Sequence, residues 1–124
     1  MLELVDLDVP VLERLAAGDV AGASALVGAP VPAELVAEAS RLWGVFAERR
    51  AHVGEPGWTI QLLVEDGVVV GHGGFHEPPD AEGVVEIGYT VVAAARGRGL
   101  AQQAVRLLLE RARVSGRVRV VRAC

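Results

Sequence analysis

A run of six residues near the C-terminus has the composition of a phosphate-binding turn. It reads Arg-Gly-Arg-Gly-Leu-Ala and lies between an apolar run and a long amphipathic segment. Glycines let a backbone approach a ligand closely, and the first amides of a helix have no acceptor within the helix. Such amides point outward and bind phosphate. We therefore predict a diphosphate site on the backbone of Arg96, Gly97, Arg98, Gly99, Leu100 and Ala101.

Two better-known phosphate motifs do not match this turn. A dinucleotide-binding fingerprint needs a third glycine where Gln102 stands. A P-loop needs the sequence Gly-Lys-Ser/Thr, and this chain contains no lysine. The alternative for the segment is a plain tight turn that opens a helix.

Two histidines form a second candidate cluster. His72 and His76 fall on one face of a strand predicted at 68–76, and Glu77 follows. Because no third ligand is evident, we predict no bound metal. The alternative is that both histidines border the site of a substrate.

The elements that position these residues follow from hydrophobic periodicity and turn residues. Asp66-Gly67 between two apolar runs indicates a hairpin, and Pro10 and Gly18 bound a helix. The predicted strands are 2–7, 58–65, 68–75, 84–92 and 117–123, and the predicted helices are 10–18, 32–52 and 100–114. Residues 18–33 are predicted to form a loop.

These elements predict a single domain of the α/β class, also described as α+β. A length of 124 residues is that of one domain. The last third reads strand, turn, helix, strand, which indicates a βαβ unit. We expect a mostly antiparallel mixed sheet flanked by helices, with Trp43 and Phe46 in the core.

The charges are unevenly distributed. Residues 96–124 hold eight arginines against Glu110 alone, a net +7, whereas residues 1–95 carry a net −11. A basic segment beside an acidic body indicates a polyanionic partner, either a phosphorylated cofactor or nucleic acid. Nucleic acid is disfavoured because residues 96–124 contain no aromatic side chain and the whole chain has a net charge of −4.

The composition excludes several other classes of protein. No uncharged stretch is long and unbroken enough to cross a bilayer, so we predict no membrane partner. The first eight residues carry three acidic side chains rather than the basic start of a secretory signal. The single cysteine, Cys124, has no partner for an intrachain disulfide. We expect a cytoplasmic protein.

The last third of the chain resembles the GNAT superfamily of N-acetyltransferases. The family signature is Gln/Arg-x-x-Gly-x-Gly/Ala after a strand that often reads Glu-Ile-Gly-Tyr. Here Arg96-x-x-Gly99-x-Ala101 follows Glu-Ile-Gly-Tyr at 86–89. The resemblance implies acetyl-CoA as co-substrate, with its pyrophosphate on the amides of 96–101. Its pantetheine arm would pair with the strand backbone at Val91 and Val92, and strand 117–123 would then have to splay away.

The resemblance also implies the reaction and its base. An acetyl group would pass from acetyl-CoA to a primary amine of a small molecule, peptide or protein. Such an amine has a pKa of about 10.4 and must lose a proton before it attacks. Glu86 projects from the strand face opposite the predicted core and is the implied general base. Its alternative role is that of an acidic residue on a solvated sheet face.

Further expectations concern the oxyanion, the general acid and the charge of the acceptor. Backbone amides near Val92 would stabilise the developing oxyanion. Tyr89 is predicted on the core face and is therefore not offered as the acid. The acidic body favours a cationic acceptor. The rival function is a regulatory module that binds acetyl-CoA without catalysis.

The chain departs from the family pattern at its end. Family members continue past this strand with a helix and two more strands, which often carry a Tyr or Ser general acid. We therefore expect residues 1–124 to form one GNAT-like domain that is incomplete at its C-terminus. Strand 117–123 would leave an apolar edge that another chain, such as the second copy in a homodimer, could cover.

Overall fold

A computed structural model describes residues 1–38 and 41–123. Five strands form one sheet in the order β1-β2-β3-β4-β5. They are β1 (Leu2–Asp6), β2 (Ile60–Glu65), β3 (Val68–Phe75), β4 (Val84–Val91) and β5 (Val120–Ala123). Neighbouring strands from β1 to β4 are antiparallel, and β5 is parallel to β4. The predicted mixed, mostly antiparallel sheet is confirmed.

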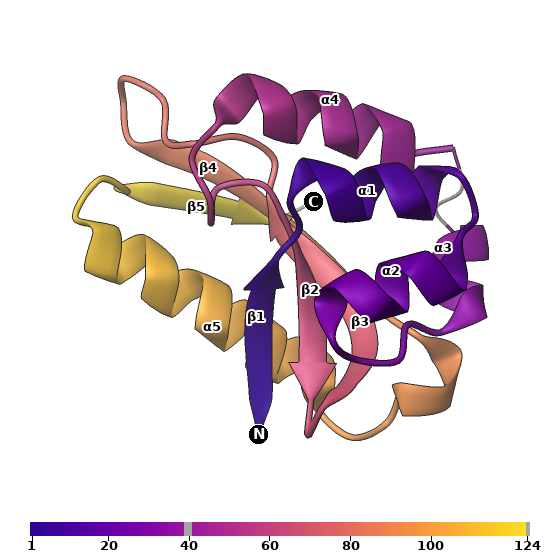
Figure 1. Cartoon of the computed structure of the whole chain (residues 1–124). Helices are drawn as coiled ribbons and strands as arrows, with labels where there is room; N and C mark the ends of the chain where they lie inside the picture. Colours follow the sequence, from indigo (N-terminus) through magenta and orange to yellow (C-terminus); the bar gives the residue numbers. More distant parts are fainter. Residues whose placement is uncertain (39–40, 124) are drawn as a thin grey trace.

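Helices cover both faces of this sheet. They are α1 (Val9–Ala16), α2 (Val20–Val27), α3 (Ala33–Glu38), α4 (Trp43–Val53) and α5 (Leu100–Ser115), with a short 3-10 turn, η1 (Ala93–Ala95). Figure 1 shows α1 to α4 gathered on one side of the sheet and α5 running along the other. No described helix is both long and apolar enough to cross a membrane.

The predicted loop at 18–33 is wrong because it contains α2. This helix is rich in alanine, which has the highest helix propensity, but lacks a clear apolar stripe. Its ends carry ordinary capping signals. The Asp19 carboxylate accepts from the Gly22 amide at 2.8 Å, and Gly28 ends the helix with a φ of 78°.

The single helix predicted at 32–52 is two helices. Residues 39–40 lie outside the described part of the chain, but Arg41 and Leu42 form a turn before α4 begins. The indole N–H of Trp43, which is fully buried, donates to the Val36 carbonyl at 3.1 Å. That carbonyl lies in the last turn of α3, where a carbonyl has no N–H donor within the helix. The buried indole of Trp43 therefore links the start of α4 to the last turn of α3.

Local sequence explains the hairpin and the βαβ unit. Asp66 and Gly67 both have positive φ, 50° and 79°, as the tight turn between β2 and β3 requires. One face of α5 is buried against the sheet through Leu100, Ala104, Leu108 and Ala112. The helix thus connects β4 to the parallel β5, as predicted.

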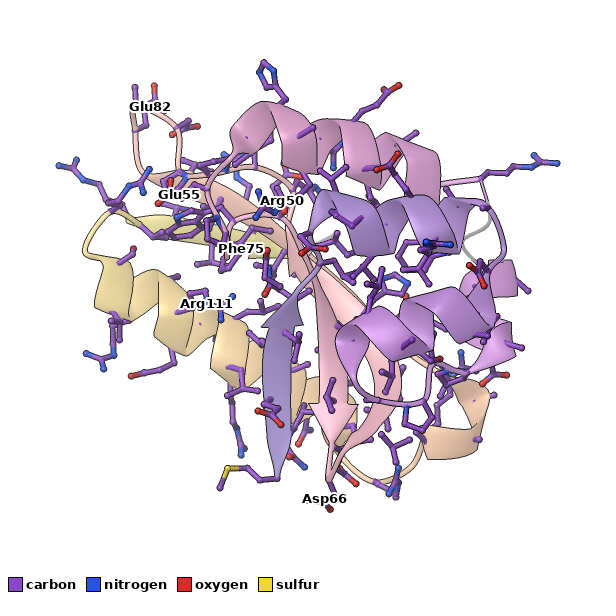
Figure 2. All side chains as sticks on the ribbon, viewed as in Figure 1. Arg50, Glu55, Asp66, Phe75, Glu82 and Arg111 are labelled. Carbon is purple, nitrogen blue, oxygen red and sulfur yellow. The ribbon has the colours of Figure 1, made fainter. Side chains whose placement is uncertain are left out.

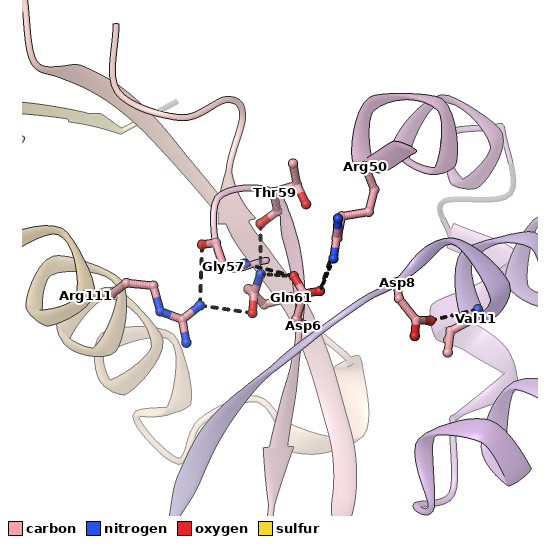
Figure 3. A network of polar contacts seen from close by, with 8 residues as sticks. All are labelled: Asp6, Asp8, Val11, Arg50, Gly57, Thr59, Gln61 and Arg111. Atoms are coloured by element: carbon pink, nitrogen blue, oxygen red, sulfur yellow. Dashed lines mark hydrogen bonds and ion pairs between the residues drawn. The ribbon is translucent and has the colours of Figure 1, made fainter. Parts of the chain in front are cut away.

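A polar network joins the two helical layers around the end of β1 (Figure 3). The Asp6 carboxylate accepts from Nε and Nη2 of Arg50, from the Gly57 amide and from Nε2 of Gln61, at 3.0 to 3.1 Å. Oε1 of Gln61 accepts from Arg111 at 3.0 Å. Figure 2 shows Arg50 and Arg111 approaching this point from opposite sides of the sheet. Asp6 and Gln61 thereby connect α4 to α5.

Candidate active site

The turn between η1 and α5 is held against the end of β4 by one arginine. The Arg96 amide donates to the Ala93 carbonyl at 3.2 Å, and its Nε donates to the Val91 carbonyl at 3.0 Å. Gly97 and Gly99 follow with φ of 83° and 72°, which glycine adopts without steric cost. These two glycines turn the chain into α5.

A row of backbone amides follows this turn. Within the described chain, the amides of residues 97–102 donate to no protein acceptor, and the first bond into the helix runs from Gln103 to the Gly99 carbonyl at 3.2 Å. All of these residues except Arg98 border a hollow of about 230 Å³. The lining of the hollow is Val91, Ala95, Arg96, Gly97, Gly99, Leu100, Ala101 and Gln102.

Two of the eight residues predicted to bind the cofactor lie outside this hollow. The Arg98 side chain instead pairs with Glu65, at 3.0 Å from Oε1. The Val92 side chain is buried, and the Val92 amide donates to the Val70 carbonyl of β3 at 2.9 Å. The prediction that the amide at Val92 stabilises an oxyanion is therefore wrong for that residue.

The register of β4 identifies the backbone groups that face away from β3. In an antiparallel pair, the N–H and C=O of one residue point to the same neighbouring strand. Because Val92 and Glu86 bond to β3, the odd-numbered Tyr89 and Val91 direct their backbone groups to the opposite edge. β5 pairs with β4 only over 84–87, so no described strand covers that edge beyond Ile87. Along the described length of β5, Val120–Ala123, the two strands stay paired.

Tyr89 is not buried with the other residues on its face of β4. Val85, Ile87 and Val91 are buried as predicted, but the Tyr89 side chain is 44% exposed. It lies beside the part of β4 that β5 does not cover. The prediction that Tyr89 belongs to the core is therefore wrong.

Glu86 projects from the other face of β4, as predicted. Its side chain is 46% exposed, and Oε2 lies 3.2 Å from Nδ1 of His76. The two residues are also linked through the backbone, because the His76 amide donates to the Glu86 carbonyl at 3.0 Å. Regular strand pairing therefore holds the imidazole beside the carboxylate.

A cavity of about 160 Å³ lies between α4 and strands β3 and β4. Its walls come from Phe46, Arg49, Thr59, Ile60, His72, Gly73, Gly74, Phe75, His76, Gly88 and Tyr89. An adjoining hollow of about 310 Å³ shares Arg49 and His76 with it and reaches Glu86. The two predicted histidines therefore line one cavity, and Glu86 lies next to it.

His72 is the buried member of the histidine pair. Burial lowers the pKa of its imidazole to about 4, so the ring is neutral at physiological pH. Its ring packs edge-on against Trp43, with centroids 5.3 Å apart. In the described ranges, no group of three or more His, Cys, Asp or Glu side chains is arranged to hold a metal ion.

Comparison with protein families decides the class of the chain. The model of the acetyltransferase (GNAT) domain matches residues 5–124. The chain belongs to this family. The prediction of an acetyl-CoA-dependent N-acetyltransferase is confirmed at the level of the family. A search of curated proteins finds no significant match to this GNAT chain.

Solved structures agree with the fold. The GNAT chain is similar to the microcin C7 self immunity acetyltransferase MccE in complex with acetyl-CoA and AMP, with 14% identity, a TM-score of 0.60, and coverage of 97% of this chain and 68% of that one. It is also similar to a ribosomal-protein-alanine N-acetyltransferase from Brucella melitensis biovar Abortus 2308, with 17% identity, a TM-score of 0.59, and coverage of 100% and 81%. The aminoglycoside N-acetyltransferase AAC(6')-Iy in complex with CoA shares 15% identity, with a TM-score of 0.54 and coverage of 100% and 76%.

Proposed function

We propose that this GNAT domain transfers the acetyl group of acetyl-CoA to the primary amine of a small molecule or peptide. The observation that carries the proposal is the row of amides at 97–102, which have no acceptor within the described chain. They lie at the start of a 16-residue helix, where the helix dipole favours negative charge. The pyrophosphate of the donor is the anion that this proposal assigns to them.

The open edge of β4 receives the rest of the donor in this proposal. Tyr89 directs its backbone groups and Val91 directs its amide to that edge, while the Val91 carbonyl accepts from Arg96. The hollow beside Val91 continues to Gly97 and Gly99. An extended pantetheine arm can pair with such an edge as an added strand does. The Tyr89 amide replaces that of Val92 as the donor to the developing oxyanion.

Glu86 is the proposed general base. It accepts a proton from the acceptor ammonium, directly or through a water, and the freed amine nitrogen attacks the thioester carbonyl. The new C–N bond forms, the C–S bond breaks, and CoA departs as the thiolate, which takes up the second proton that the nitrogen loses on becoming an amide. His76 keeps the carboxylate beside the cavity between α4 and the sheet. That cavity holds the acceptor.

Titration calorimetry with acetyl-CoA tests the donor site. Gly99→Glu adds a carboxylate beside the proposed pyrophosphate and places a side chain at a φ of 72°, and we expect at least a tenfold loss of affinity. Gly116→Glu is the matched control, because Gly116 ends the same helix with a φ of 69° and open space around it. Equal binding by both variants and wild type, or no binding at all, contradicts the proposal.

The rival function, a regulatory module that only binds acetyl-CoA, predicts a different result. Such a module would bind acetyl-CoA but release no CoA thiol with any primary amine. A panel of amino acids, peptides, polyamines and aminoglycosides separates the two functions. Amine-dependent thiol release supports the transferase.

A further inference from the structure

Arg49 is an unpaired cation at the junction of the two cavities on the α4 side of the sheet. It lines both the cavity against β3 and the hollow that reaches Glu86. Its side chain is half-buried, yet it makes no ion pair or hydrogen bond within the described chain. The next residue, Arg50, is by contrast bound to Asp6. A guanidinium is always charged, so its partial burial without a partner has a cost that an anionic ligand would offset.

The charges around Arg49 distinguish the two cavities. The hollow that reaches Glu86 is lined by three carboxylates, those of Glu77, Asp80 and Glu86, together with Arg122 and His76. The cavity against β3 has no carboxylate in its lining, and its buried His72 is neutral at physiological pH. A polyamine would therefore meet an arginine and no anion in that cavity. This arrangement disfavours the cationic acceptor that the acidic composition suggests.

The size and walls of the cavity limit the rest of the ligand. Its volume is about 160 Å³, and Phe46, Ile60 and Phe75 contribute apolar walls. An apolar cavity of roughly 150 Å³ is known to accept benzene. The space therefore suits one aromatic or branched apolar group, which is smaller than an aminoglycoside.

Thr59 supplies an independent indication that a polar ligand binds here. It lines the same cavity and is 1% exposed, and its Oγ1 has no hydrogen-bond partner among residues 1–38 and 41–123. Buried hydroxyls are nearly always hydrogen-bonded. A hydroxyl that lies at a cavity wall without a partner is therefore expected to bond a ligand in the cavity. A hydroxyl can donate to a carboxylate oxygen.

We infer that the acceptor is a primary amine bearing one apolar group of about the size of a benzene ring and a carboxylate that Arg49 binds. Apolar α-amino acids have this chemistry. The apolar group enters the cavity against β3, the carboxylate faces the guanidinium fork, and the amine lies toward Glu86. Arg49 acts on substrate choice and takes no part in proton transfer. The inference rests on the proposed function, because it concerns the acceptor of the same reaction.

Acetyl transfer to matched acceptors tests the inference. The acceptors are L-phenylalanine, L-phenylalanine amide, 2-phenylethylamine and spermidine. Transfer to each is measured as release of the CoA thiol. We expect wild type to prefer L-phenylalanine over its amide by about ten- to a hundredfold in kcat/KM, the size of a charged hydrogen bond. Arg49→Ala should remove this preference and leave 2-phenylethylamine unaffected. Arg106→Ala, an exposed arginine of α5, is the control.

Two results would overturn the inference while the proposed function stands. One is equal or better transfer by wild type to 2-phenylethylamine or spermidine. The other is an equal loss on every acceptor in Arg49→Ala, which would mean that Arg49 only supports the fold. A failure of the proposed function is detected separately, as absence of acetyl-CoA binding in the calorimetric titration.

A binding measurement keeps the test independent of turnover. N-acetyl-L-phenylalanine, the product of the expected reaction, is titrated into the chain in the presence of CoA. Binding to wild type that Arg49→Ala weakens by about tenfold or more supports the inference. Absence of binding, or equal binding by both proteins, overturns it.

Discussion

The Nδ1 atom of His76 lies 3.2 Å from the Oε2 atom of Glu86. The contact does not depend on a flexible loop, because the backbone bond between the same two residues continues the pairing of β3 with β4. Both side chains are about half exposed, at 44% and 46%. The Glu86 carboxylate is therefore accessible to a ligand, while its contact with His76 restricts its orientation.

Glu86→Gln should abolish most of the acetyl transfer and leave the donor site intact. Glutamine keeps the shape of the side chain but cannot accept the ammonium proton. General-base catalysis contributes roughly 10²- to 10⁴-fold, so kcat should fall by that factor. Steady-state thiol release gives kcat, and calorimetry should return the wild-type dissociation constant for acetyl-CoA.

Glu82→Gln is the matched control for this substitution. Glu82 is exposed on the turn before β4, and its side chain has no partner among the described residues (Figure 2). It should retain wild-type rates. An unchanged kcat in Glu86→Gln would show that Glu86 is only a solvated acidic residue.

Asp6→Ala should destabilise the fold more than Asp8→Ala. Asp6 receives four hydrogen bonds, two of them from Arg50, and its loss leaves the buried Gln61 amide with one partner fewer. Asp8 accepts one bond, from the Val11 amide at the start of α1. We expect losses of about 3 kcal/mol and about 1 kcal/mol respectively. Urea denaturation measures both, and equal losses would contradict the assigned role of the network.

The last third of the chain could be predicted because its signals are local. Gly97 and Gly99 separate two strongly patterned segments, and the helix α5 then brings β5 beside β4 as a parallel strand. Glu86 falls on the correct face because alternation along a strand is strict. These inferences need only the spacing of hydrophobic residues along the chain and the general rule for how a helix connects two parallel strands.

Features that depend on tertiary contact could not be predicted. The exposure of Tyr89 does not follow the alternation of the strand, and the hydrogen bond of the Val92 amide to Val70 depends on which edge of β4 meets β3. The hydrogen bond of the Trp43 indole to Val36 links two helices where periodicity predicts one. Arg49 carries no motif, and the absence of a partner for its side chain is visible only in three dimensions. The Asp19 and Gly28 caps of α2, by contrast, are readable in the sequence.

Stability should fall on acidification because of His72. Its pKa is about 4 in the folded chain and about 6.5 when unfolded, so between these values the unfolded state binds the extra proton. This contribution is complete above pH 6.5, is lost as pH falls toward 4, and amounts to about 3 kcal/mol. In His72→Phe, the free energy of unfolding should depend less steeply on pH within this window.

His52→Gln serves as the control for the pH series, because His52 is exposed on α4. Its unfolding free energy should follow that of wild type from pH 4 to 7. Parallel curves for wild type and His72→Phe would mean that folding does not change the pKa of His72.

Thr59→Val and Ser24→Ala should change stability in opposite directions. The Thr59 hydroxyl is buried without a partner, so valine removes an unsatisfied polar group at nearly constant shape and should stabilise the chain by about 1 kcal/mol. The Ser24 hydroxyl donates to the Val20 carbonyl at 2.8 Å and accepts from the Val31 amide at 3.0 Å. Alanine leaves that amide unpaired and should cost about 1 kcal/mol.

Acetyl transfer to L-phenylalanine adds a second measurement on Thr59→Val. If the hydroxyl bonds the acceptor, the more stable variant should have a raised KM for this acceptor and an unchanged affinity for acetyl-CoA. A stabilised variant with wild-type KM would mean that the orphan hydroxyl is a packing defect. A destabilised variant would mean that the hydroxyl has a partner in solution, such as a bound water, which valine cannot replace.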